Sequence, residues 1–227
     1  ELLKPKYVNP ESIEGLQSAA NAILLARTNK SPVTILGDYD VDGITATNIL
    51  YRLFCYFGLK TSYRLPKRFS EGYGISMAAI DEIADTNAVI VTVDNGISAI
   101  EAIAYAKSKG FTVIVIDHHL PGEKLPDADV IVDPHIHPEN NGYENYCGAG
   151  LALKLAELML NDLPKDSSIT PKVEQEVNGE LLKMTVLAAI GTIADVMPLN
   201  CPRNRFFLCY QYVERKEGVS RIARGSD

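Results

Sequence analysis

A run of three aspartates near the start of the chain is the densest group of residues that could do chemistry. Gly37–Gly43 reads Gly-Asp-Tyr-Asp-Val-Asp-Gly, with carboxylates at Asp38, Asp40 and Asp42. In an extended segment, alternate side chains point to one side, so these carboxylates repel one another unless a cation lies between them. The pattern predicts a divalent-metal site. It does not fit an EF-hand, because an apolar run precedes it and Ile49 stands where the twelfth-position glutamate belongs.

Two further segments offer metal ligands directly after apolar runs. Asp94-Asn95-Gly96 follows one run, and Asp117-His118-His119 follows the next. Adjacent residues that leave a strand diverge, so one histidine can bind metal while the other faces a substrate. A mixed carboxylate and imidazole ligand set favours Mn²⁺ over Ca²⁺ and leaves Mg²⁺ and Zn²⁺ open. Taken alone, Asp195 is best explained as a polar stop after an apolar helix. His135 and His137 lie in a loop rich in Pro and Asn, which does not favour a metal site.

Other common catalytic patterns are missing from the sequence. There is no GxxxxGK[ST] phosphate-binding loop and no GxSxG nucleophile elbow. Gly148-Ala149-Gly150 opens a predicted helix, but it lacks a preceding strand and the third glycine of a dinucleotide-binding fingerprint. The sequence therefore favours metal-dependent chemistry over these alternatives.

The elements that must position these residues alternate between strands and helices. We predict strands at 33–36, 61–65, 88–93, 112–116 and 130–132, and helices at 13–24, 44–57, 77–84, 97–109, 149–160, 173–194 and 203–215. A polar loop is expected at 134–147. This order predicts an α/β fold in which a parallel sheet has helices on both faces, followed by a helical C-terminal part. Four of the strands lead into an aspartate, and ligands of such sheets bind outside the carboxyl ends of the strands.

Composition and charge narrow the class of protein. The 227 residues are 46% hydrophobic, which excludes a disordered chain, and the longest apolar runs are too short to predict a membrane span or a membrane partner. Four scattered cysteines without a CxxC pair are typical of a cytoplasmic protein. The net charge is −7, but residues 200–227 hold six basic and three acidic residues, so residues 1–199 have a net charge of −10. We therefore expect residues 1–199 to bind a polyanion weakly.

The combination of motifs resembles the DHH phosphoesterase superfamily, and most closely its RecJ branch of single-strand-specific exonucleases. Five segments carry the resemblance across about residues 30–205: Gly37–Gly43, Arg68–Gly74, Val93–Ile97, Asp117–His119 and Gly191–Leu199. It implies one DHH phosphoesterase domain over residues 1–227. Within it we expect an N-terminal helix to about 30, a sheet core at 31–135, a loop and helices that complete the site at 136–200, and the start of a linker helix at 201–227. Members usually continue into a second domain and often an OB-fold, whose patterns do not occur here, so we expect a catalytic core.

The resemblance also implies a ligand set for two divalent ions, preferably Mn²⁺ and otherwise Mg²⁺. One ion would be held by Asp38 and Asp40, and Asp94 would bridge to the second. The second ion would be held by Asp42, His118 and Asp195. The catalytic residues would be Asp94, Asp117, His118 and His119. Of these, His119 would contact the scissile phosphate and Asp117 would orient the imidazoles. Arg68 and Tyr73 would bind substrate, with Arg64 as a further candidate.

The function implied is metal-dependent hydrolysis of phosphodiester bonds in single-stranded nucleic acid. A 5′-to-3′ exonuclease that acts on single-stranded DNA rather than RNA, in DNA repair and recombination, fits best. A phosphoesterase that acts on short oligoribonucleotides, pAp or cyclic dinucleotides is one alternative. A non-catalytic Cdc45-like scaffold is another, against which the intact ligands argue. The identity of any repair partner stays open.

Overall fold

The structure is a computed structural model that describes residues 8–66, 74–141, 143–161 and 171–198. Several predicted features fall outside these ranges. They are Arg68, Tyr73, the segment 203–215 and the whole of the last predicted domain region, 201–227. The described part of the chain contains the whole predicted sheet and every predicted metal ligand.

The centre of the fold is a five-stranded sheet in which all neighbouring strands are parallel. The strands are β1 (Val33–Leu36), β2 (Thr61–Arg64), β3 (Val89–Val93), β4 (Thr112–Ile116) and β5 (Val130–Val132). Their order across the sheet is β2-β1-β3-β4-β5. After β1 the chain moves to one side to form β2, and it then returns past β1 to form β3. The carboxyl ends of β1 and β3 therefore flank a topological switch point, where open α/β sheets bind ligands.

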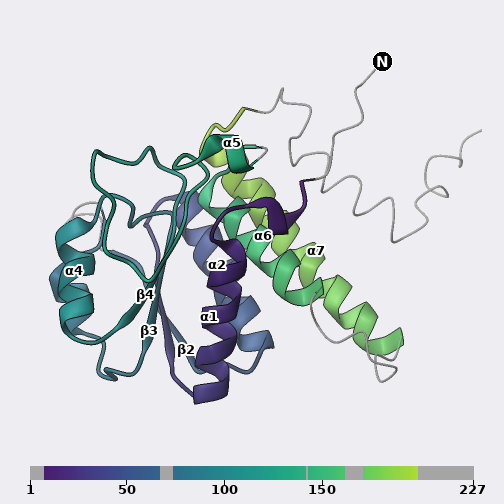
Figure 1. The fold of residues 1–227 in the computed structure, drawn as a ribbon. Coiled ribbons are helices and arrows are strands. Elements are labelled where there is room, and N and C mark those ends of the chain that lie inside the picture. The colour runs from purple at the N-terminus through teal and green to yellow at the C-terminus, as the bar shows by residue number, and fades with distance from the viewer. Residues whose placement is uncertain (1–7, 67–73, 142, 162–170, 199–227) are drawn as a thin grey trace, which may run out of the picture.

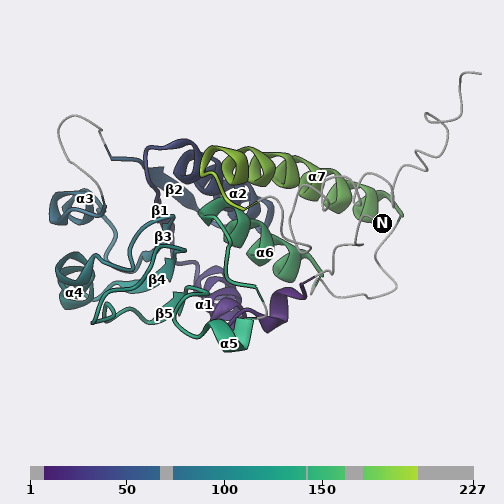
Figure 2. The same ribbon diagram turned by 90° about the horizontal axis from the view of Figure 1, so that it is seen from above.

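Helices cover both faces of this sheet, as predicted (Figures 1 and 2). The helices are α1 (Leu16–Asn29), α2 (Val41–Tyr56), α3 (Met77–Asp81), α4 (Ile100–Ser108), α5 (Pro138–Asn141), α6 (Gly148–Asn161) and α7 (Pro171–Ala194), and a 3₁₀ turn, η1, spans Pro10–Ser12. In β4, Ile114 and Ile116 join the core under α1, α2, α6 and α7, whereas Val113 and Val115 join the core under α3 and α4. The alternation along each strand thus builds two cores, because successive side chains point to opposite faces.

Two helix starts beside the predicted ligands differ from the prediction, and hydrogen bonds to aspartates explain both. Helix α2 begins at Val41 rather than Ile44, because the side chain of Asp40 caps it by accepting from the Gly43 N–H at 2.8 Å. Asp42 therefore lies in the first helical turn, and the expectation of three carboxylates in one extended segment was wrong. Helix α4 begins at Ile100 rather than Ile97, because the Ile97 N–H donates to the Asp117 carboxylate.

The segment 134–147, predicted to be a polar loop, contains the one-turn helix α5 (Figure 2). Its last residue, Asn141, is fully buried. The Asn141 side chain donates to the carbonyls of Pro134 and His137 at 3.3 and 2.7 Å, and it accepts from the Glu14 N–H at 2.7 Å. An apolar-periodicity pattern cannot reveal this order, because a buried amide rather than a buried apolar face holds the segment in place.

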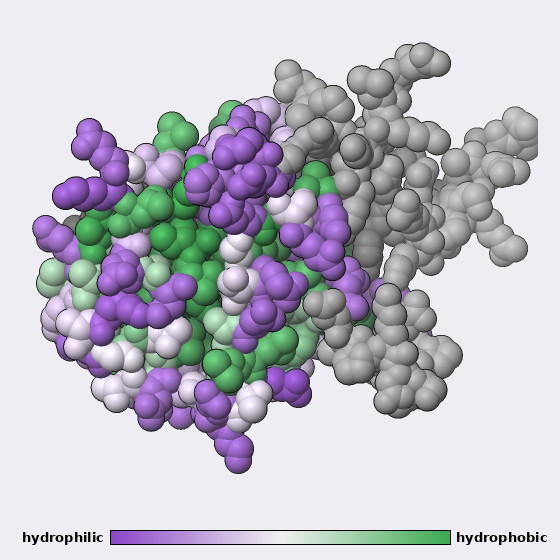
Figure 3. Space-filling model, in the orientation of Figure 1, coloured by the Kyte–Doolittle hydropathy of each residue, from purple (hydrophilic) through white to green (hydrophobic). Residues whose placement is uncertain are grey.

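Helix α7 is the longest helix of the described chain. By length and composition Gln175–Ala194 could cross a membrane, and 33% of its apolar window is buried in the fold. It packs along α2 and α6 (Figure 2), where Leu181, Met184 and Ala188 join the main core. On the face in Figure 3, a central strip of apolar residues is bordered by hydrophilic ones. The absence of a membrane partner stays a prediction.

Candidate metal centre

Six predicted ligands meet at the carboxyl edge of the sheet, at the switch point between β1 and β3. Their ligand atoms form overlapping groups in which all atoms lie within 4.8 Å of one another: Asp38 with Asp40 and Asp94, and Asp42 with His118 and Asp195. A further group joins Asp94, His118 and His119. The structure therefore brings together residues that are up to 157 positions apart in the chain (38 to 195).

The three aspartates after β1 are held in different ways. Asp38 Oδ1 accepts from the Tyr39 N–H at 2.7 Å, and Asp40 caps α2. Asp42 lies at the start of α2, and its two oxygens also accept from Gly148 and Ala149 N–H, at 2.6 and 3.0 Å, at the start of α6. A helix N-terminus stabilises negative charge. Asp42 is thus fixed by the ends of two helices.

Close packing of α6 and α7 against these carboxylates requires glycine at two positions. A Cβ on Gly148 would lie 2.6 Å from Asp94 Cβ and 2.9 Å from its Oδ1. A Cβ on Gly191 would contact Asp42 Oδ1, and it would lie 2.8 Å from Ala149 Cβ. These glycines let α6 and α7 approach the cluster.

Asp94 is the most perturbed group of the site. It is 2% exposed, and its φ of 61° lies in the left-handed region, which costs free energy for a residue other than glycine. Burial first, and then the negative charges of Asp42 and Asp40, raise its pKa to about 10. Strain and a perturbed pKa at one residue are typical of a functional position.

His118 links the buried carboxylates of the second group. Its Nε2 lies 3.0 Å from Asp94 Oδ1, 3.8 Å from Asp42 Oδ2 and 3.7 Å from Asp195 Oδ2. Asp195 directly follows the last residue of α7, where the helix dipole disfavours a negative charge. Burial raises the pKa of Asp195, and nearby Asp42 and Asp40 add to that rise while His118 opposes it. A carboxylate at this position is disfavoured unless a cation binds it, so Asp195 is better explained as a cation ligand than as a polar residue that only ends the helix.

Asp117 holds the two histidines in place through hydrogen bonds. Its Oδ1 accepts from the N–H groups of His118 and His119 and lies 2.7 Å from His119 Nδ1, while its Oδ2 accepts from Ile97. Burial favours a higher pKa for Asp117, but the bonds from His119 and Ile97 outweigh it and lower the pKa. The same contact with Asp117 raises the pKa of His119. His118 is buried and His119 is 56% exposed, but their ring centroids lie only 4.5 Å apart, so the two rings do not diverge as expected.

The donor set fits divalent cations. Without a counter-charge, burial and mutual repulsion keep a proton on Asp94 at neutral pH, which a bound cation would displace. Carboxylate oxygens with one imidazole suit Mn²⁺ and also Mg²⁺. Asp94 shares one group with Asp38 and Asp40 and another with His118 and His119, so it lies between the two predicted sets of ligands.

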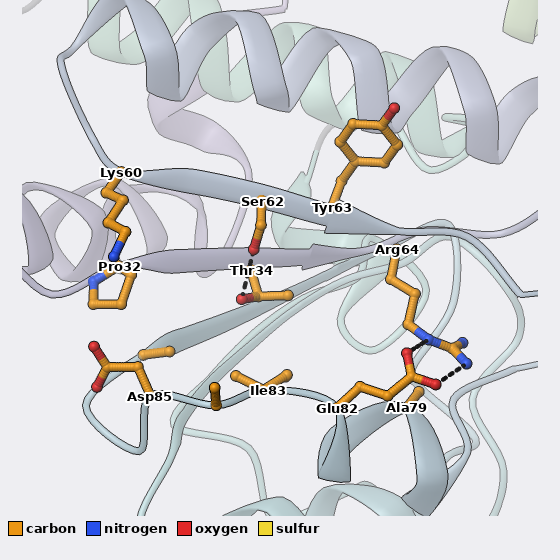
Figure 4. Close-up of a pocket in the computed structure, with 12 residues that line it drawn as sticks. Pro32, Thr34, Lys60, Ser62, Tyr63, Arg64, Ala79, Glu82, Ile83 and Asp85 are labelled. Carbon is orange, nitrogen blue, oxygen red and sulfur yellow. Dashed lines mark hydrogen bonds and ion pairs between the residues drawn. The ribbon is translucent and has the colours of Figure 1, made fainter.

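Other candidates lie outside the cluster. His135 and His137 do not join any metal-binding group among the described residues. A separate hollow of about 320 Å³ lies between β1, β2 and α3 and is lined by residues of both charge signs, which Figure 4 draws as sticks. There the guanidinium of Arg64 binds both carboxylate oxygens of Glu82, at 2.7 and 3.1 Å. Arg64 thus belongs to an ion pair and not to an open basic groove.

Sequence reasoning missed the part played by Gly148, Ala149 and Gly191. The sequence pattern identifies the first two residues only as part of an incomplete dinucleotide fingerprint. The available signal was glycine inside otherwise apolar helical segments, which often marks a close approach of backbone. The sequence could not show which residue makes this close approach, because Asp42 lies 106 residues before Gly148.

Comparison with known proteins extends these observations. The chain is 36% identical over 199 residues to the single-stranded-DNA-specific exonuclease RecJ of Bacillus subtilis, covering 86% of this chain and 23% of that protein. It is 34% identical over 217 residues to RecJ of Escherichia coli, covering 95% and 36%. A crystal structure of exonuclease RecJ bound to manganese matches with a TM-score of 0.73 and 32% identity, covering 89% of this chain and 48% of that one.

These matches confirm the predicted resemblance and fold, while the chain spans only about a quarter to a third of the curated relatives' length. The profile of the DHH family, N-terminal domain, matches residues 32–189, which include β1 to β5 and all of the predicted ligands except Asp195. On this match, which covers more than half of its length, the chain belongs to the DHH family.

Proposed function

We propose that this chain is the catalytic core of a cytoplasmic enzyme that hydrolyses phosphodiester bonds in single-stranded DNA from the 5′ end, in DNA repair and recombination. The observation that carries the proposal is the convergence of six ligands at the switch point of the sheet. The names of the relatives support DNA as the substrate, and the manganese-bound relative supports Mn²⁺.

In this proposal each group of the cluster has a role. Asp38 and Asp40 hold one divalent ion, Asp42, His118 and Asp195 hold another, and Asp94 contacts both. When bound, two such ions would supply a nucleophilic water at neutral pH and stabilise negative charge on the phosphate. No protein nucleophile is required.

His119 is the proposed contact to the scissile phosphate. Asp117 fixes its Nδ1 and raises its pKa, so the ring carries a proton over a wider pH range and presents Nε2 to an anion. Arg68 and Tyr73 are also proposed as substrate contacts. Both lie outside the described residues.

Labelled oligonucleotides test this function. Single-stranded DNA and RNA, labelled at either end, are incubated with the protein and Mn²⁺, Mg²⁺ or chelator. We expect Mn²⁺-dependent shortening of DNA from the 5′ end. The matched variants Asp40→Asn and Asp127→Asn each remove one exposed carboxylate, inside and outside the cluster, and only the first should abolish cleavage. Cleavage of dinucleotides alone would favour the small-substrate alternative, and no cleavage with any ion would contradict the proposal.

A further inference from the structure

The end of β5 repeats a local arrangement found at the end of β4. Asp117 directly follows β4 and precedes His119 by two residues, and Asp133 directly follows β5 and precedes His135 by two residues. In each case the histidine N–H donates to Oδ1 of the aspartate, at 3.2 Å for His119 and 2.9 Å for His135. The chain therefore holds two Asp-x-His units on neighbouring strands.

The register of the sheet sets these units side by side. Ile116 of β4 pairs with Val132 of β5, so Asp117 and Asp133 are the next residues in line. Paired residues of parallel strands direct their side chains to the same face. Asp133 also interacts electrostatically with Asp117, His118 and His119. It therefore belongs to the edge of the sheet that carries the metal cluster.

The second unit lacks a contact that the first one has. Asp117 has both oxygens hydrogen-bonded, one of them to the ring of His119. Asp133 is 4% exposed, and its Oδ2 is buried without a hydrogen-bond partner among the described residues. Burial raises the pKa of Asp133 to about 7. A buried carboxyl oxygen of this kind calls for a donor, since nearly all such atoms in native proteins have one.

In the first unit the histidine ring contacts Oδ1 of the aspartate, and Oδ2 accepts from the Ile97 N–H. The second unit has no hydrogen bond to Oδ2 among the described residues, so that oxygen can accept from the imidazole of His135. His119 reaches Asp117 from the same sequence separation, with Nδ1 2.7 Å from Oδ1. The backbone around His135 is fixed, because Asn141 binds the carbonyls of Pro134 and His137 on either side of it. The side chain of His135 is only half-buried, so its ring can turn toward Asp133 without moving the loop.

We propose that Asp133 and His135 form a second phosphate-binding unit, in which Asp133 positions the His135 ring against the substrate phosphate next to the scissile one. This inference rests on the proposed function and deepens it. It makes His135 a substrate contact that favours chains with several phosphates, and Asp133 a positioning residue that acts through it. Bringing the ring to Asp133 would also give the buried oxygen its missing donor.

Steady-state cleavage of a short single-stranded DNA by the full chain tests the inference. We expect His135→Gln to raise KM about ten-fold with kcat nearly unchanged, the size typical of one hydrogen bond to a charged group. Asp133→Asn should raise KM in the same direction. His137→Gln is the matched control, because His137 is exposed in the same loop and lies 3.5 Å from Glu139 rather than near the cluster. It should behave as wild type.

A neutral linkage locates the contact. Replacing the phosphodiester on one side of the scissile bond, and then on the other, by a methylphosphonate removes the charge that His135 would bind. At one of these two positions the wild-type KM should rise and the effect of His135→Gln should disappear. Thermal melting of each variant confirms folding, and His135→Gln reports even where Asp133→Asn fails to fold.

The outcomes separate the two proposals. If the wild type cleaves DNA and His135→Gln matches His137→Gln on every substrate, the second unit is wrong and the proposed function stands. An effect of His135→Gln that persists with both neutral linkages would also overturn the contact. A wild type that cleaves no single strand with Mn²⁺ would overturn the function and this inference together.

Discussion

Replacement of Asp94 by asparagine should raise the stability of the metal-free protein while it removes activity. Asp94→Asn keeps the shape of the side chain but cannot ionise. Burial and the charges of Asp42 and Asp40 raise the pKa of Asp94 to about 10 in the folded chain, from an ordinary value of 3.8. The metal-free folded state therefore retains a proton that the unfolded state has lost.

The sign and size of the effect follow from this difference in pKa. Below about pH 4 both states are protonated, and Asp94 costs no stability. As the pH rises toward 10, stability falls by about 1.4 kcal/mol per unit, which reaches at most ~4 kcal/mol at pH 7. Asparagine avoids this loss. Since 1 kcal/mol shifts Tm by about 2–4 °C in a chain of this size, we expect metal-free Asp94→Asn to melt at least ~5 °C higher at pH 7.

Two assays check both halves of the prediction. Thermal melts in chelator at several pH values should show a higher Tm for Asp94→Asn than for the wild type. This difference in Tm should be absent near pH 4 and should widen as the pH rises. Asp127→Asn, which removes an exposed carboxylate, should show no such difference. With Mn²⁺ the wild type should have the higher Tm. The kcat of Asp94→Asn should fall more than ten-fold, since Asp94 is grouped with ligands on both sides of the cluster. A less stable metal-free variant at pH 8, or a kcat above about a tenth of wild type, a change of ~1.4 kcal/mol, would refute the reasoning.

Three further predictions follow from the same geometry. Titration calorimetry with Mn²⁺ should find two sites, and a count of one, or binding that survives loss of Asp94, would contradict the ligand assignment. Gly191→Ala should weaken Mn²⁺ binding in that titration at least ten-fold with its metal-free melt still cooperative, because the methyl group displaces Asp42; unchanged affinity would show that the helix can shift. Asp117→Asn should lower the pKa of His119 toward its ordinary value, seen by NMR, and reduce kcat by roughly 10–100-fold; an unchanged pKa would exclude Asp117 as its cause.

The sheet and the identity of its ligands could be predicted because local signals and topology agreed. Near-continuous Val and Ile runs, each ending in an aspartate, identify buried parallel strands, and the carboxyl ends of parallel strands share one edge. That reasoning placed Asp38, Asp94 and Asp117 together without any structure. Asp195 needed the family resemblance, because nothing in its own segment shows that α7 returns to the sheet edge.

The contacts that could not be predicted join segments far apart in the chain through backbone or amide groups. Asp42 is held by N–H groups at the start of α6, and Asn141 of the polar segment accepts from the Glu14 N–H. Such bonds leave no periodic pattern, since every residue carries a backbone donor. The early start of α2 has a local cause, because Asp40 accepts from the Gly43 N–H and so serves as a helix cap as well as a member of the cluster.

The elements of the fold differ in how far they stabilise the negative charges that they bring together. It stabilises Asp42 with two helix N-termini and Asp117 with backbone N–H groups from two loops. It places Asp94 between them in a strained conformation, and puts Asp195 at the unfavourable end of α7. These last two groups gain most from an added cation, because burial and like charges raise the pKa of each. The ligands at the sheet edge are therefore held in place before a metal binds, but Asp94 and Asp195 lack a compensating charge until it does. Metal binding and the stability of the fold are coupled through these two residues.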